Sequence, residues 1–124
     1  MLLGDLIAHL KTFDQAAYVG VDASPVALVP AAATSYRGFY EDLALTLEPE
    51  RHAKVRCVAH LVALLEGVLG TVITGYLRRG EYMVTTRTRV WLTNYGEASG
   101  ACVTGARIDS WGVVALTWEQ DREP

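Results

Sequence analysis

Residues 101–118 read ACVTGARIDSWGVVALTW and contain the clearest local structural pattern in the chain. The two halves of this stretch, 101–108 and 113–118, contain Val, Ile, Thr and Trp, which are residue types favoured in strands. Between them lies the sequence Asp109-Ser110-Trp111-Gly112, a four-residue turn that ends in glycine. This pattern predicts an antiparallel β-hairpin. The C-terminal third of the chain is therefore expected to be rich in β-strands.

Upstream of the hairpin, helical and extended patterns alternate. Apolar residues recur at helical spacing over residues 1–13, which predicts an amphipathic N-terminal helix. Short β-prone runs follow at 18–21 and 26–29, and further strands are expected over 42–47 and 85–93. A length of 124 residues suits one domain. We therefore predict a single α+β domain over residues 1–124, with an N-terminal helix, a long central helix and an antiparallel C-terminal sheet.

The central helix is expected to run from about Glu50 to Leu77. The sequence Glu48-Pro49-Glu50 favours a helix start, and an apolar stripe extends from Cys57 to Tyr76. Such a helix would be about 40 Å long at ~1.5 Å per residue, which is more than a domain of this size can cover. We therefore expect part of the stripe to face a second copy of the chain, in a homo-oligomer.

A membrane-spanning role for residues 57–77 is disfavoured. The segment has about the ~20 residues that a bilayer requires, but it includes His60 and Glu66, whose burial in lipid is costly. The first residues, MLLGDLIAHLKTFD, carry acidic side chains where a signal peptide would be basic. We expect no membrane association and a cytoplasmic location, in which Cys57 and Cys102 stay free thiols.

Charge is distributed unevenly along the chain. The net charge is −3, but residues 1–50 carry −5, residues 51–107 carry +5, and the remaining residues carry −3. Long nucleic acid is not an expected partner, because no global positive field would attract it. A local basic surface built from the middle of the chain remains possible, and most of its cations are arginines, which match phosphate groups well.

Catalytic and metal-binding motifs are not evident. The two cysteines are isolated, the three histidines lack metal-ligand spacing, and no GxSxG, HExxH or P-loop pattern occurs. A zinc site is therefore not expected. Glu41 and Asp42 form the one adjacent acidic pair that could supply a general base if one of them were buried. The other interpretation of this pair is a solvated or Arg-paired loop.

Ligand-binding residue types gather in two places. One is the stretch 35–42, which has three aromatic residues and Arg37; the other joins 85–89, 93–96 and 107–109. Aromatic rings stack on bases, Arg and Thr donate to phosphate oxygens, and Asn pairs with base edges. Arg87 and Arg89 would share one face of a strand. The alternative is a cross-strand Thr/Arg ladder with no ligand.

Two stretches of the sequence carry a resemblance to a known family. The words SYRGFYEDLAL at 35–45 and VWLTNYG at 90–96, with the order of helices and strands, resemble phage-encoded Thoeris anti-defence sponges. The resemblance implies a phage protein that acts in the cytoplasm of the infected bacterium. Such a protein binds glycocyclic ADP-ribose signals without cleaving them and uses no metal or cofactor. It also implies dimers that assemble into hexamers, and in some members a second site for the cyclic tri- or dinucleotides of CBASS defence.

The resemblance also implies roles for individual residues. Tyr82 would stack on a base, Asn94 would read a polar edge, and Arg107 would contact a phosphate. The residues that support these three would be Arg89, Tyr95, Ile108 and Asp109. Trp111 stands where the family would have another cation, which leaves Arg87 or Arg89 as substitutes for the pyrophosphate contacts. Arg51 and Arg56 are the candidates for a second site. The alternatives are a nucleotide-cleaving enzyme that uses Glu41 or Asp42, and a protein-interaction module without a ligand.

Overall fold

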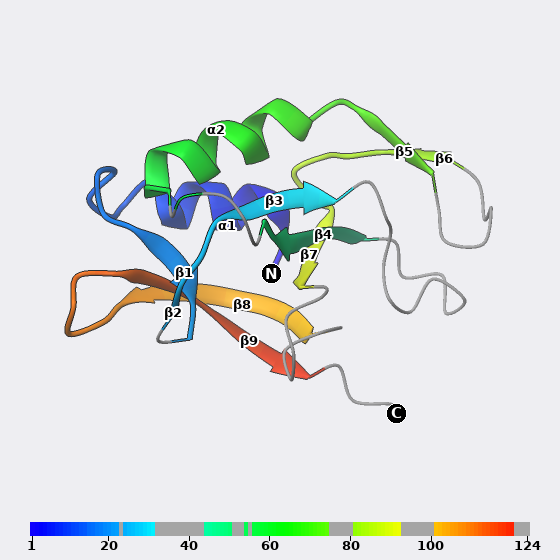
Figure 1. The fold of residues 1–124 in the computed structure, drawn as a ribbon. Helices are drawn as coiled ribbons and strands as arrows, with labels where there is room; N and C mark the ends of the chain where they lie inside the picture. Colours follow the sequence, from blue (N-terminus) through cyan, green and yellow to red (C-terminus); the bar gives the residue numbers. More distant parts are fainter. Residues whose placement is uncertain are drawn as a thin grey trace.

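The computed structural model describes residues 1–22, 24–31, 44–50, 54, 56–74, 81–92 and 101–120. Within them the chain forms two helices and nine strands, which confirms the α+β class (Figure 1). The elements in chain order are α1 (Leu3–Leu10), β1 (Val19–Val21), β2 (Ser24–Pro25), β3 (Leu28–Ala31), β4 (Ala44–Pro49), α2 (Val58–Val68), β5 (Val72–Thr74), β6 (Glu81–Met83), β7 (Arg89–Leu92), β8 (Ala101–Ile108) and β9 (Val114–Gln120).

Seven strands form one sheet in the order β2-β1-β9-β8-β7-β4-β3, and β5 and β6 form a separate antiparallel ribbon. The predicted hairpin is present as β8 and β9, and β7 pairs with β8 in the antiparallel sense. The predicted antiparallel C-terminal sheet is therefore present as β7, β8 and β9, and it belongs to a larger mixed sheet in which β1 joins β9 and β4 joins β7 in parallel. The strands of each parallel pair lie far apart in sequence, so no local turn pattern predicts their pairing.

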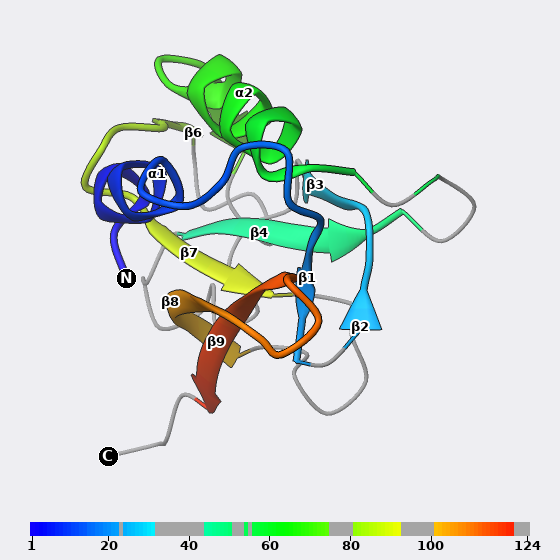
Figure 2. The same ribbon diagram turned by 90° about the vertical axis from the view of Figure 1, so that its left-hand side faces the viewer.

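Both helices pack on the same side of the sheet (Figures 1 and 2). In α1 the buried residues are Leu3, Leu6, Ile7 and Leu10, which is the spacing that the sequence predicts. In α2 they are Val58, Leu61, Val62 and Leu65. These side chains and alternate residues of the sheet strands, such as Val103 and Leu116, form one apolar cluster. The core therefore lies between the helix pair and the sheet.

The central helix is much shorter than predicted. It covers Val58–Val68 instead of 50–77, which is about 16 Å at ~1.5 Å per residue. Gly70 follows with a φ of +81°, a conformation that ends helices, and the β-branched residues from Val72 onward form β5. Before α2, Cys57 bridges to Tyr18 beside β1. The homo-oligomer was predicted from a long exposed helix, and the structure does not contain a helix of that length over Val58–Val68 and its described neighbours. Within the described ranges, no helix is long and apolar enough to cross a bilayer.

Candidate ligand-binding site

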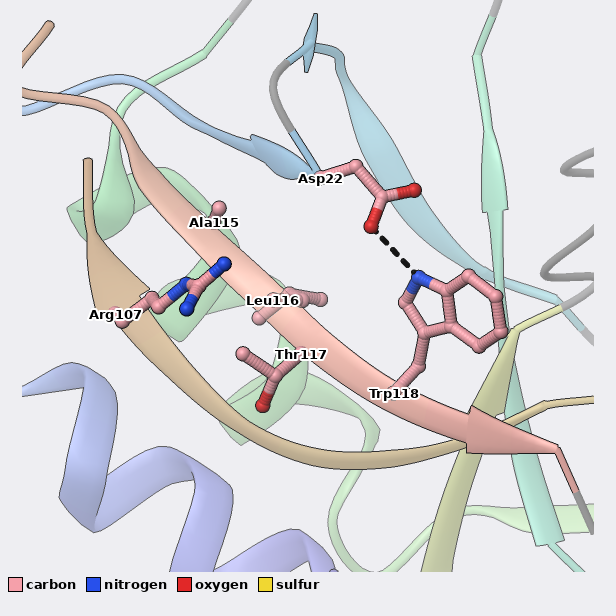
Figure 3. Close-up of a pocket in the computed structure, with 6 residues that line it drawn as sticks. All are labelled: Asp22, Arg107, Ala115, Leu116, Thr117 and Trp118. Atoms are coloured by element: carbon pink, nitrogen blue, oxygen red, sulfur yellow. Dashed lines mark hydrogen bonds between the residues drawn. The ribbon is translucent and has the colours of Figure 1, made fainter. Parts of the chain in front are cut away.

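A cavity of about 290 Å³ opens beside the C-terminal hairpin. The residues that line it come from the end of β1, from β8 and from β9: Asp22, Arg107, Ala115, Leu116, Thr117 and Trp118 (Figure 3). Strand register brings them together, because Arg107 lies opposite Ala115 across the β8–β9 pair and Val21 lies opposite Leu116 across the β1–β9 pair. The chain leaves β1 immediately after Val21, and this places Asp22 at the cavity wall.

Arg107 provides positive charge at the cavity. It is exposed, and Figure 3 shows its side chain reaching from β8 toward β9. Its cross-strand neighbour, Ala115, is small and buried, so it leaves room for the longer arginine side chain. Within the described ranges, Arg107 forms no ion pair or hydrogen bond through its guanidinium group. Its fork of N–H donors is therefore available to a phosphate or carboxylate.

Trp118 and Asp22 are joined across the cavity by a hydrogen bond. The indole Nε1–H of Trp118 donates to Oδ1 of Asp22 at 2.9 Å (Figure 3). Trp118 also packs in part against the apolar core, which fixes one side of its ring. Asp22 begins the turn between β1 and β2 and has a φ of +54°, in the left-handed region that Asp tolerates at turns better than most residues other than glycine. The bond to Trp118 therefore adds a side-chain contact to a backbone conformation that this turn already fixes.

Thr117, another residue of the cavity lining, shares a hydrogen bond with Thr104. The Oγ1 atoms of Thr104 and Thr117 are 2.9 Å apart, and both residues lie on the β8–β9 hairpin. The hairpin register shifts between Val103 and Gly105. A Cβ added at Gly105 would lie 3.4 Å from the Thr117 hydroxyl oxygen, so a glycine leaves space beside that group. Thr117 thus adds a hydroxyl donor and acceptor to the cavity that contains Arg107.

The size of the cavity limits what it can hold. Ligand pockets commonly have volumes of ~300–1,000 Å³, and about 290 Å³ is at the lower end of that range. A base or a ribose phosphate fits such a volume, whereas a larger nucleotide would extend beyond it. The lining offers an indole face, a guanidinium group, a carboxylate and a hydroxyl. This combination suits a phosphorylated ligand that also has a ring and hydrogen-bond donors.

Of the predicted site residues that the structure describes, Arg107 is the one that lines the cavity. The next two predicted residues, Ile108 and Asp109, belong to the end of the hairpin instead. Ile108 is 55% exposed. Oδ1 of Asp109 accepts the backbone N–H groups of Trp111 and Val113, at 2.8 and 3.0 Å. Asp109 therefore organises the turn between β8 and β9, and it does not line the cavity.

Tyr82, which was predicted to stack on a base, lies away from the cavity. It lies on β6, packs against the core, and donates its hydroxyl hydrogen to the backbone oxygen of Ala44 at 2.8 Å. Burial raises the pKa of the Tyr82 phenol. The ring joins the β5–β6 ribbon to the start of β4 instead of lining the cavity. The predicted stacking role therefore has a different candidate, Trp118, whose contribution the sequence analysis did not foresee.

The segment of Thr and Arg residues at 85–89 supports helix α1. The backbone oxygens of Thr86 and Thr88 accept the N–H groups of Gly4 and Leu3, at 2.9 and 2.7 Å. Because α1 has no side-chain N-cap, these carbonyl groups satisfy donors that the first helical turn leaves free. Arg87 and Arg89 are exposed, and neither lines the cavity.

The remaining predicted residues give no further support for a site. Arg56 forms an ion pair with Glu50 at 3.1 Å, so its charge is already partnered within the chain. Asn94, Tyr95 and Arg51 lie outside the described residues, as do the acidic pair 41–42 and most of the SYRGFYEDLAL stretch. Asp22 and Trp118 were missed because a parallel strand pair brings them together. Their signals in the sequence were a turn at 22–25 and a strand-terminal Trp.

No metal centre is formed by the part of the chain that the structure describes, since no three His, Cys, Asp or Glu side chains gather there. The chemical groups of the cavity are those of its lining side chains. The sequence matches no protein-family model, and comparisons with curated proteins and with solved structures find no similar protein.

Proposed function

We propose that this protein binds a small phosphorylated nucleotide at the β8–β9 cavity and sequesters it without chemical change. The ligand class that we propose is glycocyclic ADP-ribose, the Thoeris signal suggested by the SYRGFYEDLAL and VWLTNYG stretches. In this proposal the protein is a phage anti-defence sponge that acts in the cytoplasm of an infected bacterium. Cyclic tri- or dinucleotides, bound elsewhere on the chain, are a further part of the same proposal.

One observation carries the proposal: the cavity combines an unpaired guanidinium group with an indole ring. Arg107 forms no ion pair within the described ranges, and Trp118, from the neighbouring strand β9, lines the same cavity. A guanidinium group binds phosphate oxygens through two parallel hydrogen bonds. An indole ring stacks on a base and discriminates little between bases. A ligand that carries both a base and a pyrophosphate would use both groups together.

A sponge requires affinity and no catalytic group. Capture of a signal at low concentration needs a Kd near nanomolar, or about 12 kcal/mol at the 1 M standard state. A cavity of about 290 Å³ contacts only part of such a ligand. We therefore propose that the residues of a second copy complete the site, in a homo-oligomer that is a dimer or a hexamer. A closed site formed by two copies would be preorganised, which lowers the cost of binding.

The experiment is calorimetry of the purified protein with glycocyclic ADP-ribose, followed by heat denaturation and chromatography of the released ligand. We expect submicromolar binding and recovery of the intact molecule. A new product in the supernatant would instead favour the enzyme alternative. Absence of both heat and a change in melting temperature would overturn the proposal and favour a module that interacts with proteins.

A further inference from the structure

Asp22 is an unusual residue to find in a site for an anion. It contributes a carboxylate to the same cavity as Arg107. A carboxylate repels the phosphate groups that the arginine attracts, so for a simple anion its presence lowers affinity. A carboxylate in this position increases affinity only for a ligand that also carries hydrogen-bond donors.

The geometry of Asp22 indicates that its carboxylate is held in place. Its φ of +54° lies in the left-handed region that Asp and Asn tolerate at turns, so the turn between β1 and β2 fixes its backbone. Oδ1 accepts the Trp118 indole N–H at 2.9 Å. A carboxylate has about four acceptor positions, and this bond uses one of them. The remaining acceptor positions of the Asp22 carboxylate keep a fixed direction, because the turn fixes its backbone and the bond to Trp118 fixes its side chain.

We infer that Asp22 is a specificity-determining residue, whose carboxylate accepts hydrogen bonds from ribose hydroxyl groups of the bound nucleotide. This inference rests on the proposed function, because it concerns the same cavity. Carboxylates bind ribose hydroxyls in other nucleotide-binding folds. Here Arg107 would attract any phosphate, while Asp22 would favour a phosphate that is attached to ribose and disfavour an inorganic anion.

The test is Asp22→Asn, measured by calorimetry with glycocyclic ADP-ribose and with inorganic pyrophosphate. Asparagine keeps an oxygen that can accept the Trp118 N–H, and it tolerates positive φ at least as well as aspartate, so the variant should fold. We expect binding of glycocyclic ADP-ribose to weaken at least about fivefold, because a charged acceptor becomes a neutral one. Pyrophosphate should bind roughly threefold more tightly, because a nearby negative charge is gone.

The sign of the first change decides the inference. If Asp22 makes no bond to the ligand, its loss removes only repulsion, and glycocyclic ADP-ribose would bind the variant as tightly as the wild type or more tightly. That result would overturn the role of Asp22 and leave the proposed function standing. If the wild type fails to bind glycocyclic ADP-ribose at all, the proposed function and the inference both fall. Asp14→Asn is the matched control, since Asp14 is exposed, accepts a backbone N–H from Ala16, and does not line the cavity.

Discussion

The turn at residues 85–88 and the β8–β9 hairpin both contain Thr and Arg residues, but their backbone groups have different hydrogen-bond partners. In the turn, the carbonyl groups of Thr86 and Thr88 are bound to the first N–H groups of α1. In the hairpin, neighbouring strands pair the backbone, and the side chain of Arg107 reaches a cavity beside Trp118 and Asp22. The same residue types therefore have their backbone groups bound to a helix in one place and a side chain at an open cavity in the other, according to which elements lie next to them.

The strongest test of this difference is Arg107→Ala beside Arg87→Ala. Loss of a charge-assisted, bidentate contact is expected to weaken glycocyclic ADP-ribose binding by roughly 10- to 100-fold, whereas Arg87→Ala should leave it unchanged. Calorimetry measures both variants, and both should keep the wild-type melting temperature because each arginine is exposed. Equal losses in the two variants would remove the distinction between the two regions.

A second test replaces the indole ring that lines the cavity. Trp118→Leu should weaken binding roughly tenfold, since stacking on a base is worth ~1–3 kcal/mol. Trp118→Phe keeps an aromatic face while it loses the N–H that Asp22 accepts, so it should retain much of the affinity. Trp111→Leu is the control, because Trp111 lies in the turn after β8 and is 86% exposed. If Trp111→Leu weakens binding more than Trp118→Leu, the ligand binds at the turn instead of the cavity.

Much of the fold could be predicted from local patterns in the sequence. The N-terminal helix and the C-terminal hairpin were predicted correctly, because periodic apolar residues and a glycine-ended turn lie within each element. The central helix was predicted too long because Val72 and Ile73 continue the apolar stripe. In the structure these residues lie on β5, where Val72 is exposed and pairs with Met83. A hydrophobic stripe alone does not distinguish a helix from a strand that follows it.

The candidate site was predicted less completely than the fold. Arg107 was identified from its residue type, but Asp22 and Trp118 were not, because their contact spans 96 residues of sequence and depends on the parallel β1–β9 pair. Tyr82 was assigned to the ligand, yet its hydroxyl is bound to the backbone of Ala44. Composition indicates which chemistry is available in a chain, whereas strand order decides which side chains meet.

A smaller effect concerns the other side of the comparison, the contact between the 85–88 turn and α1. A Cβ added at Gly4 would lie 2.7 Å from the Cβ of Thr86, where two backbone hydrogen bonds fix the separation. Gly4→Ala should therefore destabilise the protein by ~1–3 kcal/mol, measured by urea denaturation. Gly67→Ala is the matched control. No atom lies within 4 Å of its added Cβ at an exposed position of α2, so it should stabilise the fold by ~0.5–1 kcal/mol. Similar stability in the two variants would mean that the turn does not approach α1 this closely.

The smallest expected effect tests whether Tyr82 is structural. Tyr82→Phe removes the hydrogen bond to the Ala44 oxygen and should cost about 1 kcal/mol of unfolding free energy near neutral pH, with ligand affinity unchanged. The pH dependence of stability gives a second measurement on Tyr82. Burial raises the pKa of its phenol in the folded state above the ordinary value of 10.0.

The unfolded chain therefore releases the phenol proton at lower pH than the folded chain, and the wild type should lose stability as the pH rises above about 10. The phenylalanine variant lacks this loss, so the stability difference between the two proteins should shrink from pH ~8 to pH ~11. Tyr18→Phe, at a residue that is 57% exposed, is the control. A large loss of ligand affinity in Tyr82→Phe, with stability intact, would return Tyr82 to the binding site and move the candidate site from the hairpin toward the β5–β6 ribbon.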